Sequence, residues 1–131
     1  FVALIDTQAG QLTYVDAAHG YGMTWDGQRL IALQDAGGPP VGAFPDLAYD
    51  AVTIPFRRGD ALLVVSDGIV EQPAGDSVER RQFDIGGIEQ AMKQAASTGY
   101  DELDTLFAAV ETFAGTTSLA DDATALLAKW V

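Results

Sequence analysis

Three aspartates occupy positions at which they could hold divalent metal ions. Asp67 directly follows an unbroken apolar run, and Asp121 and Asp122 directly precede another apolar stretch. An ionised carboxylate that leaves a wholly apolar strand is costly unless it is hydrogen-bonded, paired or bound to a cation. Sites built from oxygen ligands alone suit Mg²⁺ or Mn²⁺. Two such ions about 4 Å apart can turn a bridging water into hydroxide and clamp the oxygens of an in-line phosphoryl displacement.

The neighbouring strands would bring these aspartates together. Residues 61–65 form a short apolar run, typical of a strand buried on both faces, and residues 123–130 predict a last buried strand. If the two are antiparallel neighbours, the three carboxylates meet at one edge of a sheet. Gly68 lets the backbone turn sharply after Asp67. The alternative is an Asp-Gly hairpin turn with unrelated acids at a strand start, and spacing alone does not separate these interpretations.

The first half of the chain predicts antiparallel strands. Short apolar stretches separated by turn residues predict two hairpins, over residues 1–17 and 21–33, followed by a strand over residues 49–56. Residues 35–45 are rich in glycine and proline and predict a loop. No helical period separates the strands, which favours antiparallel pairing. The first strand, over residues 1–6, is apolar enough to predict that it is buried.

The second half of the chain predicts two helices. Residues 73–81 are polar and predict a solvated loop, after which a helix is expected to start at Gly86 and Gly87. A clearer helix is predicted over residues 101–113, where apolar side chains recur on one face and acids stand near the start. That apolar face indicates core packing and no cofactor. Strands followed by helices predict the α+β class.

Composition narrows the class of protein. A chain of 131 residues is large enough for one domain with a real core. Its net charge of −12 argues against a nucleic-acid surface, and the absence of cysteine excludes disulfides and thiolate metal sites. No apolar stretch approaches the ~20 residues needed to span a bilayer. We therefore expect a cytoplasmic protein with no nucleic-acid or membrane partner. A strand at residue 1 predicts a piece of a longer protein.

Three segments, in this order, resemble a known enzyme family. They are residues 12–19 (LTYVDAAH), 59–71 (GDALLVVSDGIVE) and 121–127 (DDATALL). They resemble the bacterial metal-dependent (PPM-type) serine/threonine phosphatases, in the branch named after the sporulation stage II E phosphatase. The loop over residues 38–42 resembles the family's glycine-proline loop, and residues 101–113 stand where the family has its last helix. The resemblance covers nearly the whole chain.

The resemblance implies a fold and a set of site residues. The implied fold is an antiparallel β-sandwich flanked by helices, with residues 1–131 as the carboxyl-terminal portion of a single phosphatase domain whose amino-terminal part is missing. The implied chemistry is phosphoester hydrolysis by a metal-activated water, with Mn²⁺ or Mg²⁺ as a binuclear centre in the complete domain. Asp67, the Gly68 carbonyl and Asp121 would be metal ligands. Asp122 stands where relatives often have Asn, so it would belong to the second shell that holds ligands or water.

The sequence also departs from the family. The other metal-binding element, a strand with an Asp and a Ser-Gly-His-Gly-like turn, is not found and is expected before residue 1. His19, the only histidine, belongs to a segment that resembles the later Asn-Ala-Gly-His motif, with Asp16 for Asn and Ala18 for Gly. We therefore predict that His19 is a hydrogen-bonded structural residue at a strand end, not a metal ligand.

Two classes of function follow. The first is a serine/threonine protein phosphatase whose substrate is a phosphorylated signalling protein; the family implies an anti-sigma-factor antagonist, with a sensor or receiver domain upstream in the parent chain. The second is a phosphatase-like module that binds a partner without catalysis, or a truncated fragment that is inactive by itself. A third reading is a small β-rich ligand-binding domain with incidental acids. An Asp with a Gly-His-Gly turn just upstream would favour the enzyme.

Overall fold

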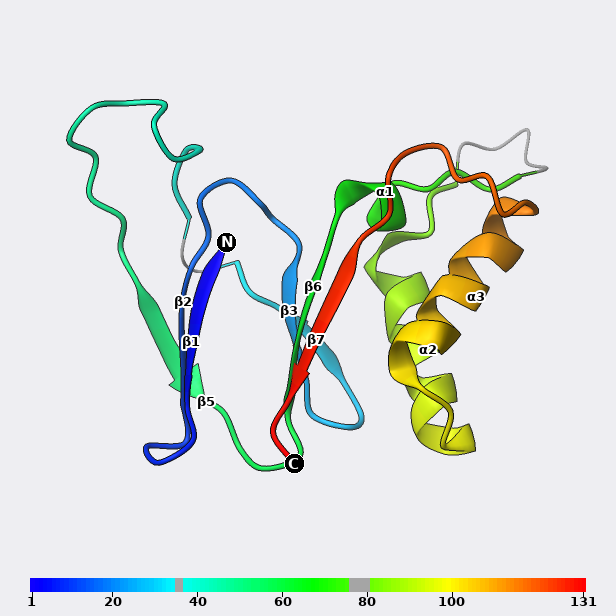
Figure 1. Ribbon diagram of the computed structural model, residues 1–131, viewed down its shortest axis with the longest axis horizontal. Helices are drawn as coiled ribbons and strands as arrows, with labels where there is room; N and C mark the ends of the chain where they lie inside the picture. The colour runs from blue at the N-terminus through cyan, green and yellow to red at the C-terminus, as the bar shows by residue number, and fades with distance from the viewer. Residues whose placement is uncertain (35–36, 76–80) are drawn as a thin grey trace.

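The computed structural model describes residues 1–34, 37–75 and 81–131. A three-stranded sheet, a four-stranded sheet and a pair of helices lie side by side as successive layers (Figure 1). The strand order is β1-β2-β5 in the first sheet and β4-β3-β6-β7 in the second, and neighbouring strands are antiparallel. This arrangement confirms the predicted α+β class, in which a β-sandwich is flanked by helices.

The elements of each layer come from distant parts of the sequence. The three-stranded sheet consists of β1 (Val2–Asp6), β2 (Gln11–Val15) and β5 (Val52–Pro55). The four-stranded sheet consists of β3 (Gly22–Trp25), β4 (Leu30–Ala32), β6 (Ala61–Val65) and β7 (Ala125–Lys129). The helices are α1 (Asp67–Val70), α2 (Asp84–Thr98) and α3 (Glu102–Ala114). Both predicted hairpins, β1–β2 and β3–β4, are present.

Strand β6 is buried on both faces, as its apolar run predicts. Leu62 points into the cluster between the two sheets, where it packs with Leu12 and Phe56. Leu63 and Val65 point the other way and belong to the cluster that the helices cover. Because side chains alternate across a strand, an apolar residue at every position is what a strand between two packed layers requires.

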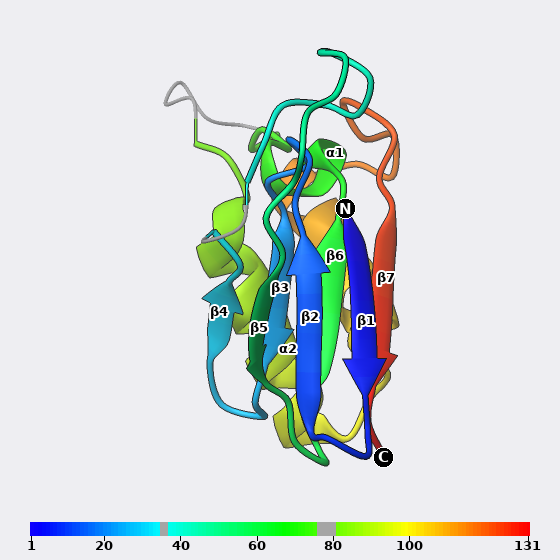
Figure 2. The same ribbon diagram turned by 90° about the vertical axis from the view of Figure 1, so that its left-hand side faces the viewer.

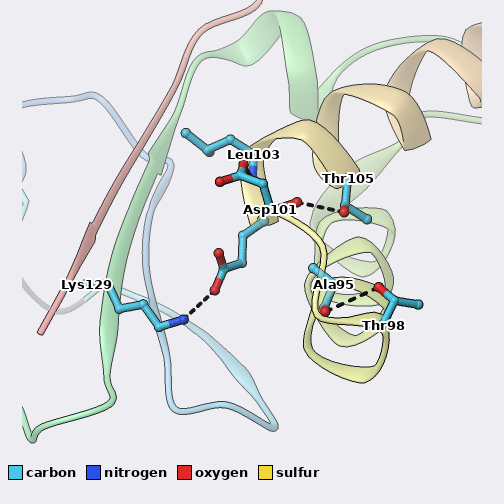
Figure 3. A network of polar contacts seen from close by, with 7 residues as sticks. Ala95, Thr98, Asp101, Leu103, Thr105 and Lys129 are labelled. Atoms are coloured by element: carbon cyan, nitrogen blue, oxygen red, sulfur yellow. Dashed lines mark hydrogen bonds and ion pairs between the residues drawn. The ribbon is translucent and has the colours of Figure 1, made fainter. Parts of the chain in front are cut away.

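Helix α3 begins within one residue of its predicted start, and Asp101 caps it. The Asp101 carboxylate accepts hydrogen bonds from the backbone N–H groups of Leu103 and Asp104 at 2.9 and 3.0 Å, and the Thr105 hydroxyl donates to the Asp101 carbonyl (Figure 3). These bonds satisfy donors that the first turn of a helix leaves unpaired. An ion pair between Lys129 and Glu102 also joins β7 to the start of α3.

Helix α2 begins earlier than predicted. It starts at Asp84 and not at the glycine pair, and the Asp84 carboxylate accepts a hydrogen bond from the Gly87 N–H at 3.1 Å. An acidic residue at the start of a helix satisfies first-turn donors, so it marks the start better than glycine does. None of the described helices is both long and apolar enough to cross a membrane.

The predicted burial of the strand over residues 1–6 is wrong. In β1 the Val2 and Leu4 side chains are 71% and 68% exposed. The reason is its position: β1 is an edge strand of the three-stranded sheet, and in the described part of the chain the outer face of that sheet is uncovered (Figure 2). An apolar run does not reveal whether a second layer covers its outer face.

The last strand is likewise less buried and shorter than predicted. The prediction spans residues 123–130, whereas β7 is half-buried and leaves Leu126 55% exposed, because it is an edge strand of the four-stranded sheet. The strand predicted over residues 49–56 is also shorter, since β5 begins at Val52. The predicted loops over 35–45 and 73–81 include residues 35–36 and 76–80, which lie outside the described residues.

Candidate functional site

The ends of β6 and β7 place the predicted aspartates beside each other. The two strands pair antiparallel, and the last pair in the register joins Val65 to Ala125. The pairing continues one step further, because the Ser66 backbone N–H donates to the Thr124 carbonyl at 2.9 Å. Asp67 at the end of β6 and the Asp121–Asp122 segment before β7 therefore stand at the same end of the sheet (Figure 1).

Gly68 is where the two segments touch most closely. A β-carbon on Gly68 would lie 2.3 Å from the Asp122 carbonyl oxygen, a distance that real β-carbons essentially never show. The glycine is thus required for space, because any side chain would push against the backbone of the facing segment. The Asp-Gly pair does not close a hairpin; the chain enters the short helix α1 there.

Three of the predicted site residues line one hollow. Asp67, Gly68 and Asp121 share a hollow of about 220 Å³ with Glu71, Gln72 and Ala120. Asp67 and Asp121 are exposed, so the hollow opens to solvent. Asp122 does not line it and is itself exposed; it contributes its backbone carbonyl against Gly68.

Both carboxylates of the hollow are oriented by the residue that follows them. The Gly68 N–H donates to Asp67 Oδ1 at 2.9 Å, and the Asp122 N–H donates to Asp121 Oδ1 at 2.7 Å. The site therefore presents two oriented acidic groups, one from each strand end.

Two further residues belong to this region and were not predicted as part of it, Glu71 and Tyr21. Glu71 lines the hollow, and its Oε1 accepts a hydrogen bond from the Tyr21 hydroxyl at 2.8 Å. This hydrogen bond, with burial and the negative charges of Glu71 and Asp67, raises the pKa of Tyr21 above its ordinary value. One signal could have identified Glu71: it follows Asp67 by four residues, one helical turn, and so shares its side of α1. No local signal identifies Tyr21, fifty residues away.

One comparison with known proteins decides the family. The family model described as stage II sporulation protein E (SpoIIE) matches residues 1–131, which is the whole chain. The chain belongs to the SpoIIE family. No curated protein matches the chain.

Solved structures share the fold of this SpoIIE family chain. The SiaA-PP2C domain of Pseudomonas aeruginosa superposes with a TM-score of 0.71 at 19% identity, over 93% of this chain and 47% of that one. The PP2C phosphatase domain of SpoIIE from Bacillus subtilis, with a fragment of its regulatory domain, gives 0.71 at 20% identity, over 95% and 35%. The RsbU and RsbW domains of Rv1364c from Mycobacterium tuberculosis give 0.64 at 22% identity, over 90% and 32%. The chain thus spans about half or less of each relative's length.

The oxygen atoms at the hollow are suitable ligands for a hard divalent cation, but few such side chains gather there. Asp67 and Asp121 offer carboxylate oxygens, the ligands that Mg²⁺ and Mn²⁺ prefer. Across residues 1–34, 37–75 and 81–131, however, no group of three or more His, Cys, Asp or Glu side chains gathers closely enough to hold a metal ion. The described residues therefore fit a metal centre in chemistry and fall short of one in ligand count.

His19 lies apart from the residues that line the hollow. Its backbone N–H donates to Asp16 Oδ1 at 2.6 Å, so the residue is hydrogen-bonded as predicted, but it lies in the connection between β2 and β3 and not at a strand end. The imidazole corrects that prediction in one respect: Nε2 is enclosed and has no hydrogen-bond partner among the described residues. The ring instead packs against the rings of Phe1 and Tyr21.

Proposed function

We propose that residues 1–131 are the carboxyl-terminal portion of a single PPM-type phosphatase domain. In its complete form the domain would hydrolyse phosphoserine or phosphothreonine on a protein. The observation that carries this proposal is the shared hollow of Asp67 and Asp121, which two neighbouring antiparallel strands bring to one end of the sheet. Membership of the SpoIIE family and a PP2C phosphatase fold support the assignment.

We assign the residues of the hollow to a centre that takes Mn²⁺ or Mg²⁺. Asp67, the Gly68 carbonyl and Asp121 would be ligands, and Asp122 would hold ligands or water from the second shell. When bound, such ions would supply a hydroxide at neutral pH and positive charge for the phosphate oxygens. The remaining ligands are assigned to the part of the domain that the relatives have and this chain does not match, since it spans 47% of the SiaA structure.

The charge of the hollow explains why cations belong to this function. Asp67 and Asp121 are acids on a chain of net charge −12, and a phosphate brought to them without cations would be repelled. In the proposed reaction the oxygen of a water bonds to phosphorus while the bond from phosphorus to the Ser or Thr oxygen breaks. The leaving oxygen takes a proton, so the products are inorganic phosphate and the free hydroxyl side chain.

A protein substrate suits the exposed position of the site. The hollow stands at an open end of the sheet, with exposed Asp67 and Asp121, so a phosphorylated segment of another protein can reach it. Within this family we propose a cytoplasmic signalling partner, an anti-sigma-factor antagonist, as the substrate. A regulatory segment in the Bacillus subtilis structure, and RsbU together with RsbW domains in the mycobacterial one, support a sensor or receiver domain upstream in the parent chain.

Phosphatase assays of the complete protein with Asp67→Asn test this function. In Mn²⁺ the wild type should hydrolyse para-nitrophenyl phosphate slowly and a phosphoserine protein faster, because a protein partner adds remote binding energy that positions the phosphate. Asp67→Asn should abolish both activities and leave folding intact, since it keeps the shape and removes the charge. Asp122→Asn should be milder. Asp104→Asn, at an exposed position in the first turn of α3, is the control and should behave as wild type.

A second candidate function is partner binding without catalysis. The observation that favours it is the small number of metal-ligating side chains gathered in the described part of the chain. If Asp67→Asn leaves a metal-dependent rate intact, or if the complete wild type is inactive in Mn²⁺ and in Mg²⁺, partner binding replaces the phosphatase assignment.

A further inference from the structure

Ser66 stands between β6 and Asp67, and its hydroxyl reaches across to the segment that carries Asp121. The hydroxyl donates to the Asp122 carbonyl at 3.1 Å and accepts a hydrogen bond from the Thr124 backbone N–H at 2.9 Å. A hydroxyl has one donor and two acceptor positions, so one short side chain can satisfy two backbone groups. Ser66 thereby joins the two strand ends on either side of the hollow.

This is not the usual use of a serine at such a position. Ser66 is the N-cap residue of α1, in extended backbone with φ −81° and ψ 164°. A serine there normally accepts a hydrogen bond from a backbone N–H in the first turn of its own helix. The Ser66 side chain makes no such bond. Its hydroxyl is turned instead toward the facing segment.

The Asp122 carbonyl is contacted from a second side as well. The oxygen that accepts from Ser66 also packs against Gly68, where an added β-carbon would come within 2.3 Å of it. The sheet does not hold this segment, because β7 begins only at Ala125. The backbone that carries Asp121 and Asp122 thus lies outside the regular ladder, where Ser66 and Gly68 contact it on one side and the Ala120 N–H donates to Gln72 Oε1 at 3.0 Å just before it.

We infer that Ser66 is a positioning residue of the site: its hydroxyl fixes the Asp121–Asp122 backbone against the turn at Asp67 and sets the separation of the two carboxylates. The effect of Ser66 on catalysis rests on the proposed phosphatase function. The two hydrogen bonds by which Ser66 joins the strand ends, called the clasp below, do not depend on that function. Without the hydroxyl both carboxylates remain, but the distance between them is no longer fixed. A misplacement of about 1 Å is enough to cost a large factor in rate.

Ser66→Ala in the complete protein tests this role by two measurements. Amide hydrogen exchange at Thr124 should become faster, because its acceptor is gone. The kcat for para-nitrophenyl phosphate in Mn²⁺ should fall about tenfold or more with little change in KM, the scale seen when a residue that orients ligands is removed. Ser66→Thr, which keeps a hydroxyl, should restore most of the rate. Ser97→Ala removes a hydroxyl that bonds only within α2, to the Gln94 carbonyl, and should match the wild type.

The outcomes separate the clasp from the function. A folded Ser66→Ala protein with wild-type exchange at Thr124 and unchanged kcat overturns the inference, as does a Ser66→Thr protein no better than Ser66→Ala. If Ser66→Ala does not fold, Ser66→Thr is compared with Ser66→Val, which has the shape of Thr without its hydroxyl. Equal amide exchange at Thr124 and equal kcat in these two variants overturn the inference. If the complete wild type has no phosphatase activity, the function proposal fails, and exchange at Thr124 alone decides whether the clasp exists.

Discussion

The two sheets of the sandwich use similar apolar strands in opposite ways. Strand β6 lies inside the four-stranded sheet, between the other sheet and the helices, and its Leu63 and Val65 are 0% and 1% exposed. Strand β1 has the same length but lies at the edge of the three-stranded sheet, and its Val2 and Leu4 are 71% and 68% exposed. Position among the layers, more than composition, decides which strand becomes core.

The candidate site lies at the end of β6, the strand that is packed on both faces. Asp67 follows β6, and Asp121 belongs to the segment that leads into its neighbour β7. Asp67 directly follows Ser66, the first residue after this packed strand, whereas Asp121 lies before β7 in a segment whose next residue, Asp122, contacts Ser66 and Gly68. The contrast with β1 therefore concerns function as well as stability.

The largest expected effect is a difference in stability between two leucine truncations. Leu63→Ala should lower the free energy of unfolding by about 3 kcal/mol, because it leaves a cavity between β6 and the helices. Leu4→Ala should cost less than about 0.5 kcal/mol, because its side chain already meets solvent in the described structure. Urea unfolding of the complete protein measures both. Equal losses would mean that the outer face of β1 is covered in the complete protein.

Two glycines, one at each sheet, should respond differently to the same pair of substitutions. Gly10, in the β1–β2 turn, has φ +67°, whereas Gly68 is limited by the Asp122 carbonyl. Gly10→Ala should cost about 1 kcal/mol, and Gly10→Asn less, because Asn tolerates the left-handed region. Gly68→Ala and Gly68→Asn should each cost about 2 kcal/mol or more, because a side chain of either kind overpacks the contact. Rescue of Gly68 by Asn would contradict the steric reading.

The smallest expected effect is a pH dependence at Tyr21. Its pKa is raised by the hydrogen bond to Glu71, so the protonated tyrosine contributes stability below the ordinary pKa, near 10, and this contribution is lost as pH rises through the folded value. Tyr21→Phe should cost about 1 kcal/mol or less at neutral pH. Urea unfolding at about pH 8 and about pH 10.5 should show a steeper loss for the wild type than for Tyr21→Phe. Parallel losses would show that the hydrogen bond does not stabilise the fold.

The sequence predicts those parts of the fold that have local signals. The apolar side chains of α3 recur at helical spacing, and the apolar run of β6 ends at turn residues, so both elements are where they are expected. The exposure of β1 could not be predicted in this way. Whether its outer face is covered depends on which layers meet there, and that information is spread over the whole chain.

The same distinction holds for the candidate site. Asp67 and Asp121 were predicted to be neighbours on the condition that their strands pair antiparallel, and the pairing of β6 with β7 meets that condition. Tyr21 could not be predicted, since its hydrogen bond to Glu71 joins the residue before β3 to the residue after α1 across fifty residues. Gly68 was expected to permit a sharp turn after Asp67, and the structure shows that it also leaves room for the Asp122 backbone.

Thermal unfolding of the complete protein with and without millimolar Mn²⁺ tests most directly whether Asp67 and Asp121 belong to one metal centre. A ligand at 100 times its Kd stabilises the folded state by about 2.7 kcal/mol, so Mn²⁺ should raise the Tm of the wild type and of the Asp104→Asn control by several degrees. Asp67→Asn and Asp121→Asn should each lose most of that rise. A wild-type Tm indifferent to Mn²⁺, or a full rise in both variants, would contradict a shared metal centre at this hollow.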